Sequence, residues 1–326
     1  MNRRSELVRD FRALVDGKSK LSWASVIGKA ERNIGLLSAD DSHSILVSIA
    51  KSLKAPKKQV HPVKIAPLSL DLIKHIIHST APFRTKANTF GFVSRLGIDW
   101  GRHLPSDHRD RVCSEFRDLF KVLCEAELST LIDAQTIGYC AETALFLNVM
   151  SEEMTTIFER KILLESSTIP PLALVQISQY LSFAESQRNV WRAIASRIAR
   201  DISSFTAQNL VSLLMSFLTS GKTSSELIEK VCVALPAISN TMVVSDCALA
   251  LECVSLLASD AVCAEKLLFF SKAMQRRLTL QIVSNPSAIL PSDIARILVS
   301  MQRLESPPTS ILMPLISDNL NFRQIA

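Results

Sequence analysis

The chain is poor in glycine and in aromatic side chains. Its 326 residues include 8 Gly, 2 Tyr and 3 Trp, and aromatic residues make up only 6% of a sequence that is 48% hydrophobic. Runs that alternate between β-branched and polar residues are also scarce. Sandwiches, barrels and nucleotide-binding α/β folds depend on strands and glycine-rich turns, so this composition argues against them and favours an all-α protein.

The sequence also lacks a catalytic signature, such as G-x-S-x-G, H-E-x-x-H or a kinase motif. Ser220–Ser225 contains Gly-Lys-Thr, but Ser216 replaces the upstream glycine of a phosphate-binding loop and no strand precedes it. We interpret it as a helix–helix turn capped by Gly221. His75 and His78 lie three residues apart, but no nearby acid or cysteine completes a metal site. We therefore expect no enzymatic activity, no cofactor and no metal.

Neither a membrane segment nor a disulfide framework is predicted. No run reaches the roughly 18 apolar residues of a membrane-spanning helix. The 7 cysteines form no C-x-x-C pair, and most lie in apolar helical phrases, which indicates free thiols in a reducing compartment. The N-terminus is arginine-rich, but Glu6 and Asp10 are unusual in a transit peptide. We expect a retained helix over Arg3–Val15, with a cleaved organellar leader as the alternative.

Basic residues are concentrated in the first third of the chain. The net charge of +6 divides into +10 for residues 1–111 and −4 for residues 112–326. An anionic partner at one end would explain this asymmetry, and so would an uneven solvated face. Lys54–Pro67 contains three prolines and four lysines, which predicts a linker or long loop between an N-terminal helical segment (1–53) and a second helical region (68–326).

An apolar helical phrase recurs in the last half of the chain. Its copies are Ala173–Phe183, Asn209–Ser220, Ala248–Ser259 and Asp293–Leu304. When their last apolar pairs are aligned, these copies lie 37–45 residues apart, and each is followed by a small or polar break and then by a second segment with a helical pattern. This spacing predicts an α-solenoid of stacked two-helix repeats of the armadillo or HEAT kind over 68–326, clearest over 169–326.

The second helices of these repeats carry the candidate binding residues. In Gln187–Ile202 the apolar side chains share an arc of about 100°, and four arginines occupy the remaining arc, so we expect the arginines to face solvent. Basic residues near the end of a later helix either continue this row or complement that helix's C-terminus. The predicted phosphate-contacting residues are Lys54, Lys57, Lys58, Lys64, Arg188, Arg192, Arg197, Arg200, Lys272, Arg276 and Arg277.

Leu210–Leu218 has the pattern Leu-x-x-Leu-Leu-x-x-Phe-Leu. With its copies, this pattern resembles the degenerate helical repeats of organellar RNA-metabolism proteins: the FAST-kinase-like, octotricopeptide and RAP group, including kinetoplastid and apicomplexan mitochondrial members. The resemblance covers roughly residues 130–326. It implies a non-enzymatic RNA-binding or scaffold subunit of a mitochondrial ribonucleoprotein complex, acting in RNA processing, editing or ribosome assembly. Its partners would be RNA and other protein subunits.

Two alternatives stay open at this point. A protein-only armadillo or HEAT scaffold would make no RNA contact, and the location could be cytoplasmic or nuclear. RNA binding predicts that outward arginines of successive units align on one side. A scaffold predicts scattered charges and an exposed apolar groove. Many proteins of the resembled group end in a compact α/β RAP module, whereas the last segment here has a helical pattern, so no nuclease-like activity is implied.

Overall fold

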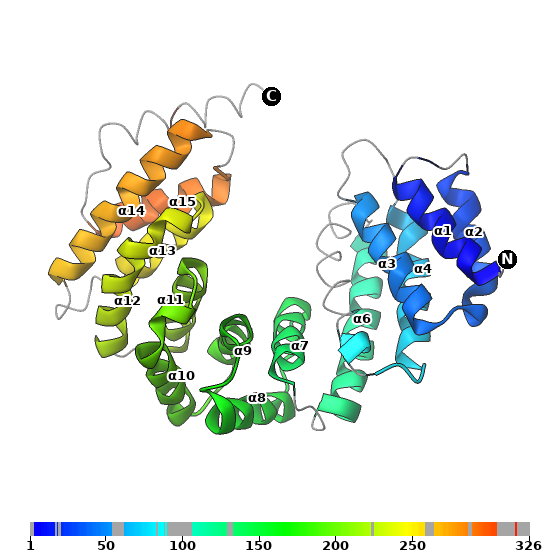
Figure 1. The fold of residues 1–326 in the computed structure, drawn as a ribbon, viewed down its shortest axis with the longest axis horizontal. Coiled ribbons are helices and arrows are strands. Elements are labelled where there is room, and N and C mark those ends of the chain that lie inside the picture. The colour runs from blue at the N-terminus through cyan, green and yellow to red at the C-terminus, as the bar shows by residue number, and fades with distance from the viewer. Residues whose placement is uncertain are drawn as a thin grey trace. The chain divides into compact units, whose positions relative to one another are not determined.

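The protein folds entirely into helices within the part of the chain that the structure describes, which confirms the all-α class. This computed structural model describes residues 3–16, 18, 21–53, 62–82, 84–87, 89, 106–128, 133–222, 225–257, 264–285, 289–304 and 317. The chain divides into two compact units, Met1–Phe158 and Glu159–Ala326 (Figure 1). None of the described helices combines the length and the apolar character that crossing a lipid bilayer requires.

The first unit packs its helices in a chain of neighbours. Their bounds are α1 (Arg3–Val15), α2 (Trp23–Asn33), η1 (Ile34–Leu36), α3 (Ala39–Leu53), α4 (Pro62–Ile77), α6 (Ser106–Glu127) and α7 (Ala134–Leu147), followed by α8 (Glu152–Glu165), in which the unit ends. α1 packs on α3, α3 on α4, α4 on α6 and α6 on α7. Phe11, Ile45, Ile49 and Phe120 are fully buried and form part of its core.

Residues 62–67 are helical, whereas the sequence predicts a linker there. α4 begins at Pro62, where the missing N–H has no helical partner to lose, and it continues through Pro67. Ile65 and Leu68 are fully buried. Burial of these side chains therefore outweighs the backbone hydrogen bond that Pro67 cannot donate.

The boundary between the two compact units does not lie at the predicted linker. Residues 54–61 lie outside the described residues, but α3 and α4, on either side of them, pack on each other. The boundary between the units lies in α8, between Phe158 and Glu159. The predicted N-terminal segment therefore belongs to the same unit as α4, α6 and α7.

The second unit contains two rows of helices. Their bounds are α9 (Pro171–Phe183), α10 (Arg188–Arg200), η3 (Ile202–Ser204), α11 (Ala207–Ser220), α12 (Ser225–Ile238), η4 (Ser239–Thr241), α13 (Val244–Leu257), α14 (Ala264–Ser284) and α15 (Pro291–Arg303). The four recurring phrases fall on α9, α11, α13 and α15, and these helices contact one another in that order. α10, α12 and α14 contact one another in the same way, which produces the second row.

Burial differs between the two rows because their sequences differ. Nine of the thirteen residues of α9 and nine of the fourteen of α13 are buried, so these helices are covered on most sides. Only five of the thirteen residues of α10 are buried. An apolar helix is stable between neighbours, whereas an amphipathic helix needs water on one side. The recurring phrases on α9 and α13 therefore form inner helices, whereas α15, the last described helix of the same row, has five of its thirteen residues buried. The arginine-bearing α10 keeps a solvent-facing side.

The turn between α11 and α12 has a specific backbone geometry. Thr206 caps the start of α11, where its side chain accepts a hydrogen bond from the N–H of Asn209. Gly221 ends the helix in the left-handed region at φ +66°, and its N–H donates to the carbonyl oxygens of Leu218 and Phe217. The predicted capping role of Gly221 is therefore confirmed.

Candidate nucleic-acid interface on α10 and α12

α10 is anchored by aromatic packing on one side. The rings of Trp191 and Phe217 meet edge to face with centroids 4.9 Å apart, and the Trp191 Nε1–H donates to the Ser186 hydroxyl at 2.6 Å. Val190, Ile194 and other side chains of this face are also buried. The opposite side of α10 carries Arg188, Arg192 and Arg200, which are exposed as the sequence predicts.

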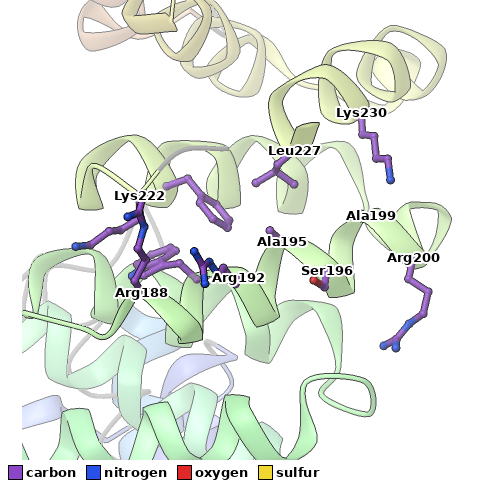
Figure 2. Close-up of a pocket in the computed structure, with 11 residues that line it drawn as sticks. Arg188, Arg192, Ala195, Ser196, Ala199, Arg200, Lys222, Leu227 and Lys230 are labelled. Atoms are coloured by element: carbon purple, nitrogen blue, oxygen red, sulfur yellow. The ribbon is translucent and has the colours of Figure 1, made fainter. Parts of the chain in front are cut away.

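A groove of about 620 Å³ lies along this exposed side (Figure 2). Ala195, Ser196 and Ala199 line its middle, where their short side chains leave space. In Figure 2, Arg188, Arg192 and Lys222 lie toward one end of the groove, and Arg200 and Lys230 lie toward the other. The complete lining is Arg188, Trp191, Arg192, Ala195, Ser196, Ala199, Arg200, Phe217, Lys222, Leu227 and Lys230.

The charge of the groove has a single sign. Among the described residues, its lining contains five cations and no carboxylate, imidazole or thiol. Among the ion pairs and side-chain hydrogen bonds between described residues, none involves the side chain of Arg188, Arg192, Arg200 or Lys222. Cations without counter-charges in a concave surface create a positive potential that attracts anions. The groove is therefore suited to a ligand with several negative charges.

Arg197 corrects the predicted outward row of arginines. This residue is only 7% exposed, and its Nη1 lies 2.6 Å from Oδ2 of Asp201, while its guanidinium stacks over Phe205 at 5.5 Å. Arg197 lies about 180° around the helix from Arg188, beside the buried Val190. The hydrogen bond from Arg197 lowers the pKa of the Asp201 carboxyl. Arg197 thus closes the end of α10 and does not face the groove.

The basic residues of α14 form a separate group. No α14 residue belongs to the described lining of the groove. Lys272 and Arg276 are exposed, whereas Arg277 is half-buried and donates from Nη2 to the main-chain oxygen of Asn240 at 2.6 Å. Of the two alternatives for these residues, continuation of the outward arginine row does not describe Arg277, because its guanidinium binds the turn that follows α12.

The lysine candidates of the first unit cannot be placed. Lys54, Lys57 and Lys58 lie outside the described residues, and so does the side chain of Lys64, whose backbone is part of α4. The structure therefore brings together three of the predicted residues, Arg188, Arg192 and Arg200.

Two residues of the groove were missed by the sequence analysis. Lys222 follows Gly221 in the segment that resembles a phosphate-binding loop, and Lys230 lies in the second turn of α12. A signal was present for Lys222, because it is the lysine of the Gly-Lys-Thr segment that resembles a phosphate-binding loop. Nothing in the sequence indicated that α12 would place Lys230 opposite Arg200.

The other chemically reactive side chains have structural environments. The His75 Nε2 lies 2.8 Å from the main-chain oxygen of Leu37. All five described cysteines are buried free thiols, and burial raises the pKa of Cys247 to about 12. The described residues contain no cluster of three or more His, Cys, Asp or Glu that could hold a metal ion. These groups therefore contribute to packing in the part of the chain that the structure describes.

No protein-family model matches the chain, and a search of curated proteins found no match to its sequence. The fold and the site define it as an all-helical protein with two rows of packed helices in its second unit and a basic groove on the outer row.

Proposed function

We propose that the chain is a non-enzymatic helical-repeat subunit of a mitochondrial ribonucleoprotein complex, in RNA processing, editing or ribosome assembly, and that it binds RNA in the α10 groove. One observation carries the RNA contact: five cations from α10, α12 and the turn before α12 line one groove, and no carboxylate is found among the described residues of its lining. The mitochondrial location and the type of complex rest on the resemblance of the Leu210–Leu218 pattern to organellar RNA-metabolism proteins.

The repeat architecture is part of the same proposal. The second unit is an α-solenoid in which α9, α11, α13 and α15 form the inner row and α10, α12 and α14 the outer row. The order of helix contacts and the greater burial of α9 and α13 than of α10 support this arrangement. Solenoids present extended surfaces along their rows, and such surfaces suit long partners such as RNA.

The chemistry of the groove matches the backbone of RNA. Arg188 and Arg200 are separated by a helical rise of about 18 Å, so the groove is long enough for more than one nucleotide. Guanidinium groups bind phosphate oxygens with two parallel hydrogen bonds, which makes Arg192 and its neighbours suitable phosphate ligands. The partner is therefore a chain of phosphates and not a single carboxylate.

Base recognition is not expected at this site. Trp191 and Phe217 line the groove, but both are only 1% exposed and pack against each other. Their faces are not available for stacking on bases, which is how many proteins recognise single-stranded RNA. We therefore expect affinity that depends on salt and varies little between homopolymers.

The experiment compares RNA affinity across a salt series. R188Q/R192Q/R200Q removes three groove charges, and R160Q/R303Q removes two charges from exposed positions outside the groove. For a single-stranded oligonucleotide measured by fluorescence anisotropy, each lost phosphate contact lowers the slope of log K against log salt by about 0.7, so the triple variant should lose about 2.

The control variant R160Q/R303Q should keep the wild-type slope of log K against log salt. Its overall affinity should change only slightly. Circular dichroism checks that all variants keep their helices. K272Q/R276Q should retain wild-type affinity if RNA is confined to the groove. Absence of binding at low salt, or equal binding by the triple variant, would overturn the RNA proposal.

A protein-only scaffold is the second candidate function. The observation that favours it is the exposure of large apolar side chains on α14, including Phe269 and Leu280. Exposed apolar residues grouped on one face are typical of protein interfaces. A chain that does not bind RNA at low salt but associates with another protein through α14 would establish this function instead.

A further inference from the structure

α14 exposes a stripe that combines three large apolar side chains with two basic ones. Phe269, Leu280 and Val283 are 68%, 62% and 59% exposed, and Lys272 and Arg276 are exposed as well. At 100° per residue, these five positions lie within an arc of about 80°. They extend over about 21 Å of helix, which is four turns.

The stripe is not the face that α14 uses for its own packing. Phe270, Met274, Leu278 and Ile282 are all fully buried and lie on the other side of the helix, and α14 packs on α12 and α13. Single exposed apolar residues are common on protein surfaces, but three large ones in one helical stripe are typical of an interface.

The charge of the stripe is also of one sign. From Phe269 to Ser284 the helix contains no Asp or Glu. Lys272 and Arg276 form no ion pair or side-chain hydrogen bond with another described residue. The neighbouring Arg277 is engaged with the main-chain oxygen of Asn240. Two cations therefore stand among three apolar side chains, and no described residue supplies a counter-charge.

We propose that this stripe docks a helix of a partner protein, with an apolar seam over Phe269, Leu280 and Val283 and with carboxylates opposite Lys272 and Arg276. The five positions follow a spacing of 3, 4, 4 and 3 residues, which is the spacing by which two packed helices meet along a seam. When the partner buries the three apolar side chains, its carboxylates pair with Lys272 and Arg276, so neither cation is buried without a counter-charge. A partner with basic residues there would be repelled, so the charges select the partner.

A lipid surface is a poorer match to the same stripe. Helices that lie on membranes keep their cations on the polar flanks, where the charges remain in water. Arg276 instead lies about 20° from Phe269, inside the apolar arc. If Phe269 and Leu280 inserted into the acyl chains, the Arg276 guanidinium would enter the apolar layer too, and its desolvation would cost much free energy. RNA is also a poorer match, because phosphates would leave the three apolar side chains uncovered.

The inference does not depend on the RNA proposal, since the peptide measurement contains no RNA and the groove variants leave α14 unchanged. The probes are two designed helical peptides of about 21 residues with the same leucine seam. One carries Glu beside the seam and the other carries Lys. The full-length protein should bind the Glu peptide at least about tenfold more tightly than the Lys peptide in fluorescence anisotropy.

Three variants make the test specific. K272E/R276E should reverse the preference and bind the Lys peptide better, a result that damage to the fold cannot produce. F269S/L280S should bind neither peptide. The matched control F183S/V233S, at positions 63% and 64% exposed outside α14, should keep wild-type affinity for the Glu peptide.

Other outcomes would overturn the proposal. Binding of neither peptide by the wild-type chain, or equal binding of both, would mean that the stripe is not a charge-selective helix site. Binding to vesicles with about 30% phosphatidylserine that F269S/L280S abolishes would make it a membrane site. A concentration-dependent dimer in sedimentation velocity that the same variant removes would make the occupant a second copy of this chain.

Discussion

The indole of Trp191 meets the ring of Phe217 edge to face, with centroids 4.9 Å apart and planes inclined at 67°. Trp191 comes from α10 and Phe217 from the recurring phrase on α11, so this contact joins an outer helix to an inner one. Both rings are almost fully buried and line the groove that holds the arginines. The same pair thus anchors α10 and excludes its own ring faces from ligand binding.

Phe217→Ala should destabilise the second unit by about 3–5 kcal/mol, because it removes a buried ring and leaves a cavity against Trp191. Denaturant unfolding followed by circular dichroism measures the change. Phe269→Ala is the matched control, since that ring is 68% exposed, and it should change the free energy of unfolding by less than about 0.5 kcal/mol. Equal effects of the two substitutions would contradict the assignment of Phe217 to the core.

Arg277→Met should cost roughly 1–3 kcal/mol of folding free energy. The substitution keeps the apolar stem but removes the charged donor to the Asn240 carbonyl oxygen, which is 37 residues away in sequence. Arg276→Met, one residue earlier and exposed, should have little effect on unfolding. If the two variants unfold at the same denaturant concentration, the hydrogen bond from Arg277 to the turn after α12 does not stabilise the fold.

Gly221→Ala should destabilise the turn between α11 and α12 by about 1 kcal/mol. A Cβ at this position meets no atom within 4 Å, so the cost comes from the left-handed backbone at φ +66° and not from a clash. Gly221→Asn should lose less stability, because asparagine adopts this conformation more readily. Thermal unfolding of the two variants separates these outcomes, and a larger loss for Asn would refute the backbone explanation.

His43 predicts a pH dependence of the first unit. Burial lowers the pKa of its imidazole, against a smaller opposing effect of Asp40, and Nδ1 lies 2.9 Å from the Thr89 hydroxyl. That hydroxyl donates to the Thr85 carbonyl oxygen, so it accepts a hydrogen bond from the Nδ1–H of the imidazole, which both protonation states can donate. Burial disfavours the charged ring, so the folded state prefers the neutral form.

This preference contributes stability above the unfolded pKa of about 6.5, and the contribution is lost as the pH falls below that value. When unfolding of the wild type is measured between about pH 5 and 8, its midpoint should be lower at the acid end of this range. His43→Gln should flatten this dependence, whereas His78→Gln, at an exposed position, should leave it unchanged. A wild-type midpoint that rises toward low pH would contradict the sign of the His43 effect.

The elements of the second unit were predictable because their causes are local. Apolar residues at helical spacing mark α9, α11, α13 and α15, and the break at Gly221 is the residue type that a left-handed cap requires. The exposed positions of Arg188, Arg192 and Arg200 followed from the helical arc. The prediction for Arg197 was wrong, although helical spacing places it beside the buried Val190, because the sequence does not show that Asp201 and Phe205 engage its guanidinium.

Sequence by itself determined the helical class and the positions of the inner helices, since both follow from composition and from a period of 3.6 residues. Only the tertiary structure decided that Pro67 remains inside α4, because the burial of its neighbours outweighs the missing hydrogen bond. The groove is likewise a tertiary feature. Lys222 and Lys230 are remote from Arg188 along the chain, and only the packing of α10 beside α12 places their charges around one space.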